Sequence, residues 1–395
     1  MMLRKSFLLN FRGSKCLIRD GEHSPEIFPA CLVSIENSTE AWSNSPSAKL
    51  AWVLELRRKR EDMSGKFDMK LTVMPAGHGD CVLVQCGDFN IMVDSGPYAA
   101  AISERVRAGL LNSLGGRPIH LAIVTHYDDD HIGGLSRALE DSALPIQALL
   151  FNSPLRISEY IDRHRYNEAD VSVRQALHVA GELTPYNPKV ILAGQQYKFY
   201  DERIVLKVLS PSGKDVLHYG KRMLAAIGGL ELAGRRGRCV PVCGRINELL
   251  AMHDDDQDAD TSETNALSLA FILTFDGRSI LFLGDSWPSV VTGSLALMRS
   301  DEERIPLDLA FVSHHGSKNN NTVELYRHIN TAHYVVSADG KQNPDVETFG
   351  RILRAAAPNQ PTFHFSEKST QLDTMFEKSD LDIRFPENGP LTIIL

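Results

Sequence analysis

Apolar runs that stop abruptly at polar residues recur along the chain. Leu121–Val124 is such a run, and two histidines and three aspartates follow it within seven residues. Ser279–Leu283 is a second, and it ends at Gly284-Asp285. Leu307–Val312 is a third, followed by Ser313 and two adjacent histidines. Runs of this kind predict strands buried in a sheet. We therefore expect the polar side chains at their ends to gather at one edge of the fold.

The stretch before the first of these runs predicts a β-rich start. Met69–Met74 alternates like a strand, and two further strands are expected at Cys81–Gln85 and Asn90–Asp94. The pattern then changes to that of a helix over Ala99–Leu114, and a second helix is expected at Leu135–Glu140. The order is strand, hairpin, helix, strand and polar loop, which predicts an α/β protein.

The rest of the chain is less regular in its middle part. Residues 140–262 read partly as an irregular insertion, with a mostly helical stretch at Ser158–Leu183 and strands at Val190–Leu192 and Ile204–Ser210. After it, the expected elements are strands at Ala266–Phe275, His333–Asp339, Thr362–Phe365 and Gly389–Leu395, and a helix that begins at Asn343-Pro344. Proline suits the first turn of such a helix.

Residues 1–68 differ in their pattern of hydrophobic and polar residues from the domain expected over residues 69–395. A hairpin around Gly13-Ser14 is expected there, followed by an amphipathic helix over Ser45–Glu61 that ends in Arg57-Arg-Lys-Arg60. Cations at a helix C-terminus complement its dipole, and this explains the basic run without a ligand. We expect this extension to pack on the main domain or to mediate a homodimer or a protein partner.

Composition and charge narrow the class of protein. The chain has 395 residues, of which 43% are hydrophobic and 23% charged, as in ordinary soluble globular proteins. Ala266–Phe275, the longest apolar run, is too short to cross a bilayer, and the N-terminus lacks the apolar core of a signal peptide. The six cysteines are scattered, so we expect them to be reduced and the protein to be cytoplasmic.

Charges in the central insertion are strongly segregated. Lys221–Arg245 carries six cations against Glu231 alone, and His253–Asp260 follows with five aspartates. The first interpretation is a solvated insertion with opposite charges at its ends. The second is a basic lip that contacts phosphates, although the net charge of −8 argues against a wholly basic nucleic-acid groove. The acidic run lacks the glycine and final glutamate of a calcium-binding loop.

The loop after Leu121–Val124 has the composition of a metal site. His126 and His131 supply borderline nitrogen ligands, Asp128 and Asp130 supply hard oxygen ligands, and the mixture suits zinc, manganese or iron(II). The glycines that follow let the backbone turn tightly near an ion.

These residues resemble the HxHxDH signature of the metallo-β-lactamase superfamily, with Asp128 in place of the second histidine. The aspartate form followed by Ile-Gly-Gly is most similar to the hydrolase domain of the competence DNA-channel protein ComEC and its soluble relatives. Gly79-Asp80, Asp94-Ser-Gly96 and His314-His-Gly-Ser317 fit further motifs of that group. The resemblance covers residues 69–136 and 262–395.

The resemblance implies a four-layer αββα sandwich that holds two divalent metal ions, zinc or manganese. It implies that one ion is held by His126 and Asp128 and the other by Asp130 and His131, with Asp285 bridging the two. His314 is expected to complete the second set. If the strand continues through both adjacent histidines, their side chains alternate, so His315 is expected to be a neighbouring or substrate-contacting group.

Candidate catalytic residues follow from the same resemblance. Asp130 is expected to orient the attacking water, and Lys318 to neutralise a phosphate. The sequence departs from the ComEC-like pattern at Asn343, where a histidine usually precedes the proline, and at His78, where a glutamine is usual. A third ligand for the ion on His126 is not identified by any motif; the candidates are His164, His178, His218 and His253.

Three functions remain open from the sequence. The first is a metal-dependent phosphodiesterase or nuclease that acts on nucleic acid or a nucleotide. The second is a hydrolase of a small ester, lactone or thioester. The third is a non-catalytic metal-binding or regulatory module, which the departure at Asn343 favours and the intact Asp130, His131 and Asp285 oppose.

Overall fold

The chain forms two compact units, Met1–Leu32 and Val33–Leu395. The structure, a computed structural model, describes residues 10–11, 14–15, 34–36, 68–164, 190–226, 241–254, 260–299 and 303–395. In the first unit β1 (Asn10–Phe11) pairs antiparallel with β2 (Ser14–Lys15), which confirms the expected hairpin. The helix and basic run expected within residues 45–61 lie outside the described residues.

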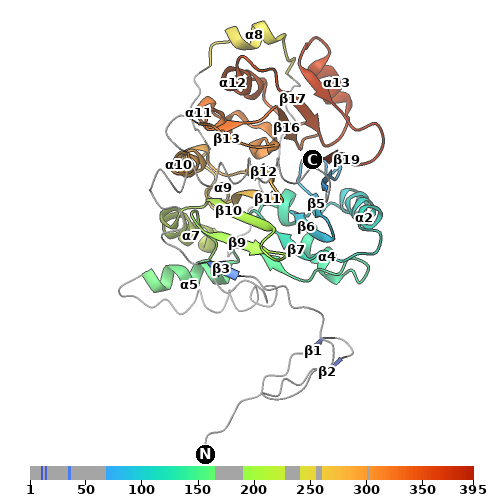
Figure 1. Ribbon diagram of the computed structural model, residues 1–395, viewed down its shortest axis with the longest axis vertical. Coiled ribbons are helices and arrows are strands. Elements are labelled where there is room, and N and C mark those ends of the chain that lie inside the picture. Colours follow the sequence, from blue (N-terminus) through green and yellow to red (C-terminus); the bar gives the residue numbers. More distant parts are fainter. Residues whose placement is uncertain are drawn as a thin grey trace, which may run out of the picture. The chain divides into compact units, whose positions relative to one another are not determined.

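Two large sheets form the second unit (Figure 1). The six-stranded sheet has, in spatial order, β19 (Leu391–Ile394), β4 (Met69–Val73), β5 (Val82–Cys86), β6 (Phe89–Val93), β7 (Leu121–Ile123) and β8 (Leu149–Leu150). The nine-stranded sheet has β18 (Asp382–Arg384), β17 (Thr362–Phe365), β16 (His333–Val336), β14 (Leu309–Phe311), β12 (Arg278–Phe282), β11 (Ala270–Phe275), β10 (Ile204–Ser210), β9 (Gln196–Phe199) and β3 (Ser34–Glu36). Parallel pairing joins β6 to β7 and β12 to β14, so the carboxyl ends of paired strands share an edge.

Helices cover the outer faces of the sheets. They are α2 (Ala100–Leu114), α3 (Asp129–Ile132), α4 (Leu135–Glu140), α5 (Pro154–His164), α7 (Gly213–Ala226), α8 (Ile246–Ala251), α9 (Glu263–Ala266), α10 (Pro288–Met298), α11 (Val323–Arg327), α12 (Val346–Ala356) and α13 (Thr370–Phe376). Two short 3₁₀ turns, η2 (Ser313–Gly316) and η3 (Lys318–Asn320), follow β14. A small parallel pair, β13 (Ile305–Pro306) and β15 (Ile329–Asn330), lies apart from both large sheets.

Three apolar layers hold this arrangement together, because alternate strand residues face opposite sides of each sheet. Leu71 and Val84 of one sheet pack with Phe271 of the other in the middle layer. The outer face of the six-stranded sheet packs on α2 and α4, and that of the nine-stranded sheet on α10, α12 and their neighbours. The order is therefore helix, sheet, sheet, helix, which confirms the predicted four-layer αββα sandwich.

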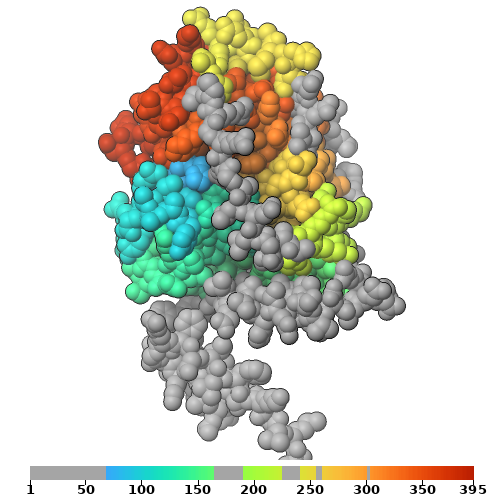
Figure 2. Space-filling view, turned by 180° about the vertical axis from the view of Figure 1, so that it is seen from behind, coloured from blue at the N-terminus to red at the C-terminus, as the bar shows by residue number. Residues whose placement is uncertain are grey.

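Seen from behind, the teal first half and the orange-to-red last part of this unit lie directly against each other (Figure 2). The contact matters because the first sheet provides the loop after β7 and the second provides the ends of β12 and β14. Side chains that are far apart in the sequence thus reach one site.

Several expected elements differ from the structure. Val190–Leu192 is not a strand, and the strand in this region is instead β9, a few residues later. The strand expected from Ala266 starts at Ala270, because Glu263–Ala266 forms α9, capped by the Ser262 side chain. Strand β3 lies within the expected extension yet joins the nine-stranded sheet by pairing with β9.

Two further expectations can be compared with the described residues: the state of the cysteines and the length of the apolar helices. Cys81, Cys86 and Cys243 are buried free thiols, as expected, and burial raises the pKa of Cys243 to about 11. In the described parts of the chain, the helices are all too short or too polar to cross a bilayer.

Candidate metal centre

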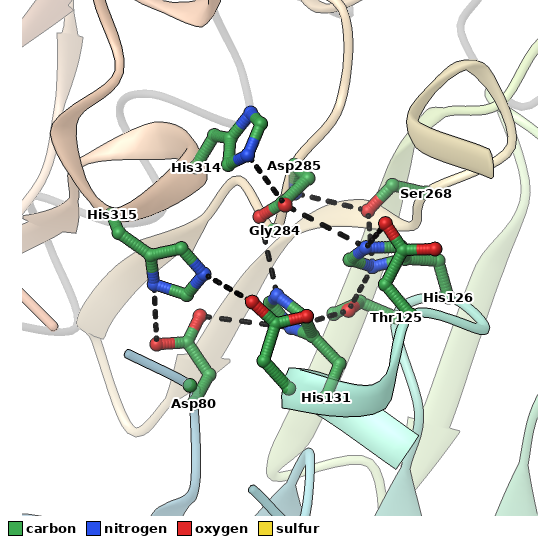
Figure 3. Close-up of polar contacts among 12 residues, drawn as sticks. Asp80, Thr125, His126, His131, Ser268, Gly284, Asp285, His314 and His315 are labelled. Atoms are coloured by element: carbon green, nitrogen blue, oxygen red, sulfur yellow. Dashed lines mark hydrogen bonds and ion pairs between the residues drawn. The ribbon is translucent and has the colours of Figure 1, made fainter. Parts of the chain in front are cut away.

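The site is formed by residues that follow the ends of strands in both large sheets. His126 follows β7, and Asp130 and His131 lie in the single turn of α3. From the other sheet, Asp285 follows β12, and His314 and His315 lie in η2 after β14. In Figure 3 their imidazoles and carboxylates point toward one shared space.

Gly284 allows Asp285 to enter that space. Its φ of 50° is in the left-handed region, and a Cβ at this position would lie 2.6 Å from the Ser268 hydroxyl. Only glycine adopts this backbone at no steric cost. The same serine hydroxyl accepts a hydrogen bond from the Asp285 backbone N–H at 3.1 Å, so the turn is tied to the segment before β11.

The Asp285 carboxylate is surrounded by three imidazoles. Its Oδ1 lies 3.3 Å from His131 Nε2, and its Oδ2 lies 3.6 Å from His126 Nε2 and 3.4 Å from His314 Nε2. His126, His131 and Asp285 form one group of potential metal ligands. Two donors bound about 2.0–2.2 Å from one ion in tetrahedral geometry are about 3.3–3.6 Å apart, so the spacing fits a shared cation.

A second group of potential ligands shares His131 with the first. It consists of Asp130, His131 and His315. His315 Nε2 lies 3.4 Å from Asp130 Oδ2, and its other nitrogen, Nδ1, lies 3.6 Å from Asp80 Oδ1. The two groups therefore form one continuous centre that shares His131.

Hydrogen bonds fix the proton positions of two of these rings. The Nδ1–H of His131 donates to Asp94 Oδ2 at 2.9 Å, and the Nδ1–H of His315 donates to the Ser337 carbonyl at 2.9 Å. In the neutral rings, Nε2 then carries the lone pair and faces a carboxylate. A carboxylate or carbonyl behind the ring is the usual support of a metal-ligating histidine.

Several buried polar atoms of the centre have no hydrogen-bond partner among the described residues. They are Nε2 of His126, His131 and His315, and Oδ1 of Asp80 and Asp285. Buried polar atoms are costly unless they are paired. Lone pairs that converge from both imidazoles and carboxylates fit a divalent cation, and the donor set suits zinc or manganese.

Charges within the centre perturb each other strongly. Burial opposes ionisation of Asp285, but the imidazoles of His314, His131 and His126 outweigh it and hold the carboxyl pKa far below its usual range. Burial also disfavours the charged form of His315, but Asp80 and Asp130 raise its pKa to about 9. Bound cations would compete with these protons, because metal ligands must be deprotonated.

The structure brings most of the predicted site residues together. His126, Asp130, His131 and Asp285 are buried and adjacent. Asp128 lies at the rim, with Oδ2 3.7 Å from His126 Nε2. Lys318 pairs with Glu347 at 2.8 Å. Among the described residues, neither His218 nor His253 belongs to a ligand group; the side chain of His164, and His178, lie outside them.

The two adjacent histidines are placed differently from the expectation. The expected alternation of the two side chains required β14 to continue through both histidines, but β14 ends at Phe311. Both histidines have left-handed backbone angles, with φ of 47° and 54°. Both rings therefore reach the centre. His315, not His314, lies beside Asp130 and His131, while His314 lies on the side of Asp285 that faces His126.

Asp80 and Asp94 also lie at the site, although the sequence pattern did not predict a role for either. Asp94 follows β6 and accepts hydrogen bonds from Thr125 Oγ1 at 2.8 Å and from His131. Asp80 lies between His131 and His315, and burial raises its pKa. Asp80 directly follows a glycine, and Asp94 directly follows the buried strand β6. These positions were the signal in the sequence that could have placed both residues at the site. His78 and Asn343 line a hollow beside Asp130 and His315.

Comparison with known proteins identifies part of this arrangement. Residues 74–146 match the model of the metallo-beta-lactamase superfamily. No curated protein matches the sequence. Among solved structures, the metallo-beta-lactamase fold protein YhfI from Bacillus subtilis is 12% identical, with 83% of this chain and 100% of that chain covered and a TM-score of 0.38.

Two other solved structures have similar scores. A putative metal-dependent hydrolase from Parabacteroides distasonis is 12% identical over 80% of this chain and 93% of that chain, with a TM-score of 0.36. The short form of human tRNase Z is 15% identical over 82% and 98%, also with a TM-score of 0.36. Together, the matched stretch and the helix, sheet, sheet, helix order give the chain the metallo-β-lactamase fold.

Proposed function

We propose that the protein is a metal-dependent hydrolase, and that its substrate is a phosphodiester of nucleic acid or a nucleotide. The observation that carries the proposal is the pair of overlapping ligand groups around Asp285 and His131. Within these groups, Nε2 of His126, His131 and His315 and Oδ1 of Asp285 are buried and have no hydrogen-bond partner among the described residues.

The residues have distinct roles in this proposal. His126, His131, His314 and Asp285 hold one side of the centre, and Asp130, His131 and His315 hold the other. A divalent cation bound there supplies Lewis acidity and lowers the pKa of a water toward neutrality. Asp130, whose carboxylate lies 3.4 Å from His315 Nε2, is placed to orient that water and accept its proton.

The shape of the site supports a substrate that lies mostly outside it. The hollow beside Asp130 and His315 has a volume of about 30 Å³, and its other lining includes Asp339, Gln342 and Asn343. This is room for one or two waters. A single phosphoryl group presented from a chain suits such a hollow better than a bulky ligand that must be enclosed.

One exposed cation, Arg222, is connected to the site through α9. Arg222 of α7 is 61% exposed and pairs with Glu263 of α9 at 3.1 Å. Glu263 is two residues from Asn265, whose amide nitrogen lies 3.4 Å from His314. Arg222 belongs to the basic segment 221–245, of which residues 227–240 lie outside the described part. The similarity to ComEC-like hydrolases, the cytoplasmic location and a dimer or partner contact through residues 1–68 stay predictions.

The test combines metal analysis with activity assays. Purified protein is expected to bind two equivalents of zinc or manganese and to cleave bis(p-nitrophenyl) phosphate only when loaded. Cleavage of single- or double-stranded DNA then tests whether the protein is a nuclease. Asp285→Asn is expected to lower the rate by at least roughly 10–100-fold, because it removes a metal ligand and the loss of even a residue that only supports a ligand usually costs that much.

Asp382→Asn serves as the matched control, because Asp382 contacts Thr362 and Arg384 at the far edge of the nine-stranded sheet. It should keep the wild-type rate. Metal binding without phosphodiester cleavage, but with cleavage of an ester or lactone, would replace the proposed substrate. If the protein bound no metal in the presence of excess zinc or manganese, the proposed hydrolase would be wrong and a non-catalytic module would be the remaining function.

A further inference from the structure

Asn320 occupies an unusual position behind the metal centre. It ends η3, is 0% exposed, and its side-chain amide touches three polar groups. Its Nδ2 lies against Asp260 Oδ2 and 3.0 Å from the Asp285 backbone carbonyl. Its Oδ1 lies 2.8 Å from His314 Nδ1.

These contacts determine which end of the amide is nitrogen. A carboxylate and a backbone carbonyl are acceptors only, and both face the same end of Asn320. That end must therefore carry the NH₂ group. The oxygen is then at the other end of the amide, which faces His314. Turning the amide over would lose both hydrogen bonds that the NH₂ group donates. The assignment thus follows from the neighbours rather than from the coordinates of the amide alone.

The orientation of Asn320 in turn determines the proton on His314. An amide oxygen accepts a hydrogen bond, so His314 Nδ1 must carry hydrogen to donate to it. A competing contact exists, because Asn265 Nδ2 lies 3.4 Å from the same Nδ1 and would need a lone pair there. The distance of 2.8 Å to Asn320 against 3.4 Å to Asn265 decides in favour of Nδ1–H.

We propose that Asn320 is a positioning residue of the metal centre: held by Asp260 and by the Asp285 carbonyl, it keeps the proton of His314 on Nδ1. The Nε2 lone pair then points at Asp285 Oδ2, 3.4 Å away, where a cation can bind both atoms. The proposal rests on the proposed metal centre for its purpose. The proton position itself can be measured without metal.

The experiment observes the His314 ring nitrogens by ¹⁵N–¹H NMR in histidine-labelled, metal-free protein, with the resonances assigned by comparison with His314→Ala. The wild type is expected to show hydrogen on Nδ1. Asn320→Leu keeps the size of the side chain but removes the acceptor, so Asn265 becomes the nearest polar neighbour. In this variant Nδ1 is expected to lose its hydrogen.

Asn320→Asp separates positioning from packing. A carboxylate at 320 still accepts from Nδ1–H, but it loses both donated hydrogen bonds and repels Asp260. A purely structural role predicts that this variant disturbs His314 at least as much as Asn320→Leu. The proposal predicts that Nδ1–H is kept. Loss of the hydrogen from Nδ1 in Asn320→Asp, or a wild-type Nδ1 without hydrogen, would overturn it.

Asn321→Asp is the control for damage to the loop. Asn321 is equally buried and donates to the Ser313 and Ser317 carbonyls, but no contact links it to His314. It should lower stability and leave the His314 proton on Nδ1. Thermal unfolding of each variant shows whether the fold is retained.

Zinc affinity measured against a competing chelator provides the second readout. Asn320→Leu is expected to weaken one zinc equivalent by about 10–100-fold, as for other residues that orient a metal ligand, and Asn320→Asp by clearly less. Unchanged zinc affinity in Asn320→Leu would overturn the positioning role. If the wild type bound no zinc, the proposed function would fail, while the NMR result would still decide the proton position.

Discussion

Two buried charged clusters lie close together in this fold, and they are built in opposite ways. In the metal centre, Nε2 of three histidines and Oδ1 of Asp285 have no hydrogen-bond partner among the described residues. In the second cluster, here called the arginine clamp and formed by Asp254, Arg351 and Arg354, each charged group has a hydrogen-bonded partner of opposite charge. Asp254 accepts two hydrogen bonds from Arg351, at 2.6 and 2.7 Å, and one from Arg354 at 2.7 Å.

The remaining donors of the clamp are used for structure. Arg351 is 3% exposed, and its Nη1 donates to the carbonyls of Lys318 and Asn321. It therefore holds the loop that carries η2 and η3, and with it His314 and His315. Burial and charge are common to both clusters. What distinguishes the candidate site is its set of buried nitrogen and oxygen atoms with no hydrogen-bond partner among the described residues, and this criterion separates function from support.

Removal of Asp254 is expected to have the largest effect on stability. Asp254→Asn leaves Arg351 buried without its counter-charge, and a guanidinium cannot lose its proton. Breaking a buried pair in this way costs about 3–5 kcal/mol. We expect the free energy of unfolding of the metal-free protein, measured in urea, to fall by that amount.

Asp285→Asn provides the contrast for that measurement. Its imidazole neighbours can release their protons when the carboxylate is lost, so the loss of stability in the metal-free protein should be clearly smaller than in Asp254→Asn. Equal losses in the two variants would mean that the metal centre, too, is mainly a structural ion-pair network.

Zinc should stabilise Asp254→Asn but not Asp285→Asn. A ligand that binds only the folded state at a free concentration one hundred times its Kd stabilises it by about 2.7 kcal/mol. We expect zinc to raise the unfolding free energy of the wild type and of Asp254→Asn by about this amount, and to have little effect on Asp285→Asn. Differential scanning calorimetry with and without zinc measures the shift.

A zinc response in Asp285→Asn as large as that of the wild type would show that the ions bind elsewhere. Asp382→Asn, at the far edge of the nine-stranded sheet, is the reference for a carboxylate change that touches neither cluster.

Much of this site could be predicted from the sequence because short apolar runs ended at ligand-type residues. The runs gave β7, β12 and β14 nearly where the structure has them. The pairing of His315 with Asp130 could not be predicted, because it depends on two consecutive left-handed residues in η2. Strand periodicity contains no information about such a turn.

The arginine clamp shows a second limit of sequence analysis. The acidic run over His253–Asp260 reads as a solvated insertion, yet the side chains of Asp254 and Asp260 are 5% and 8% exposed. Their partners, Arg351 and Asn320, are sixty or more positions away in sequence. A local pattern contains no information about a partner that only the tertiary fold supplies.

The smallest expected effect is on the pH dependence of stability, and it also separates the two clusters. Hydrogen bonds from Arg351, together with the charges of Arg351 and Arg354, hold the pKa of Asp254 below its usual range. The unfolded chain has the ordinary carboxyl pKa of about 3.9. Because the folded pKa is lower, the clamp stabilises the protein fully above that value and loses its contribution as the pH falls through the folded pKa.

The difference in unfolding free energy between the wild type and Asp254→Asn should therefore be constant from pH 8 to about pH 5 and shrink below about pH 4. Urea unfolding of the metal-free proteins at a series of pH values measures it. The centre responds in a different pH range: the pKa of His315 is raised to about 9, so protons compete with zinc through neutral pH and the stabilisation by zinc should grow as the pH rises through that range. A difference between wild type and Asp254→Asn that shrank near neutral pH would place the titrating group in the metal centre and not in the clamp.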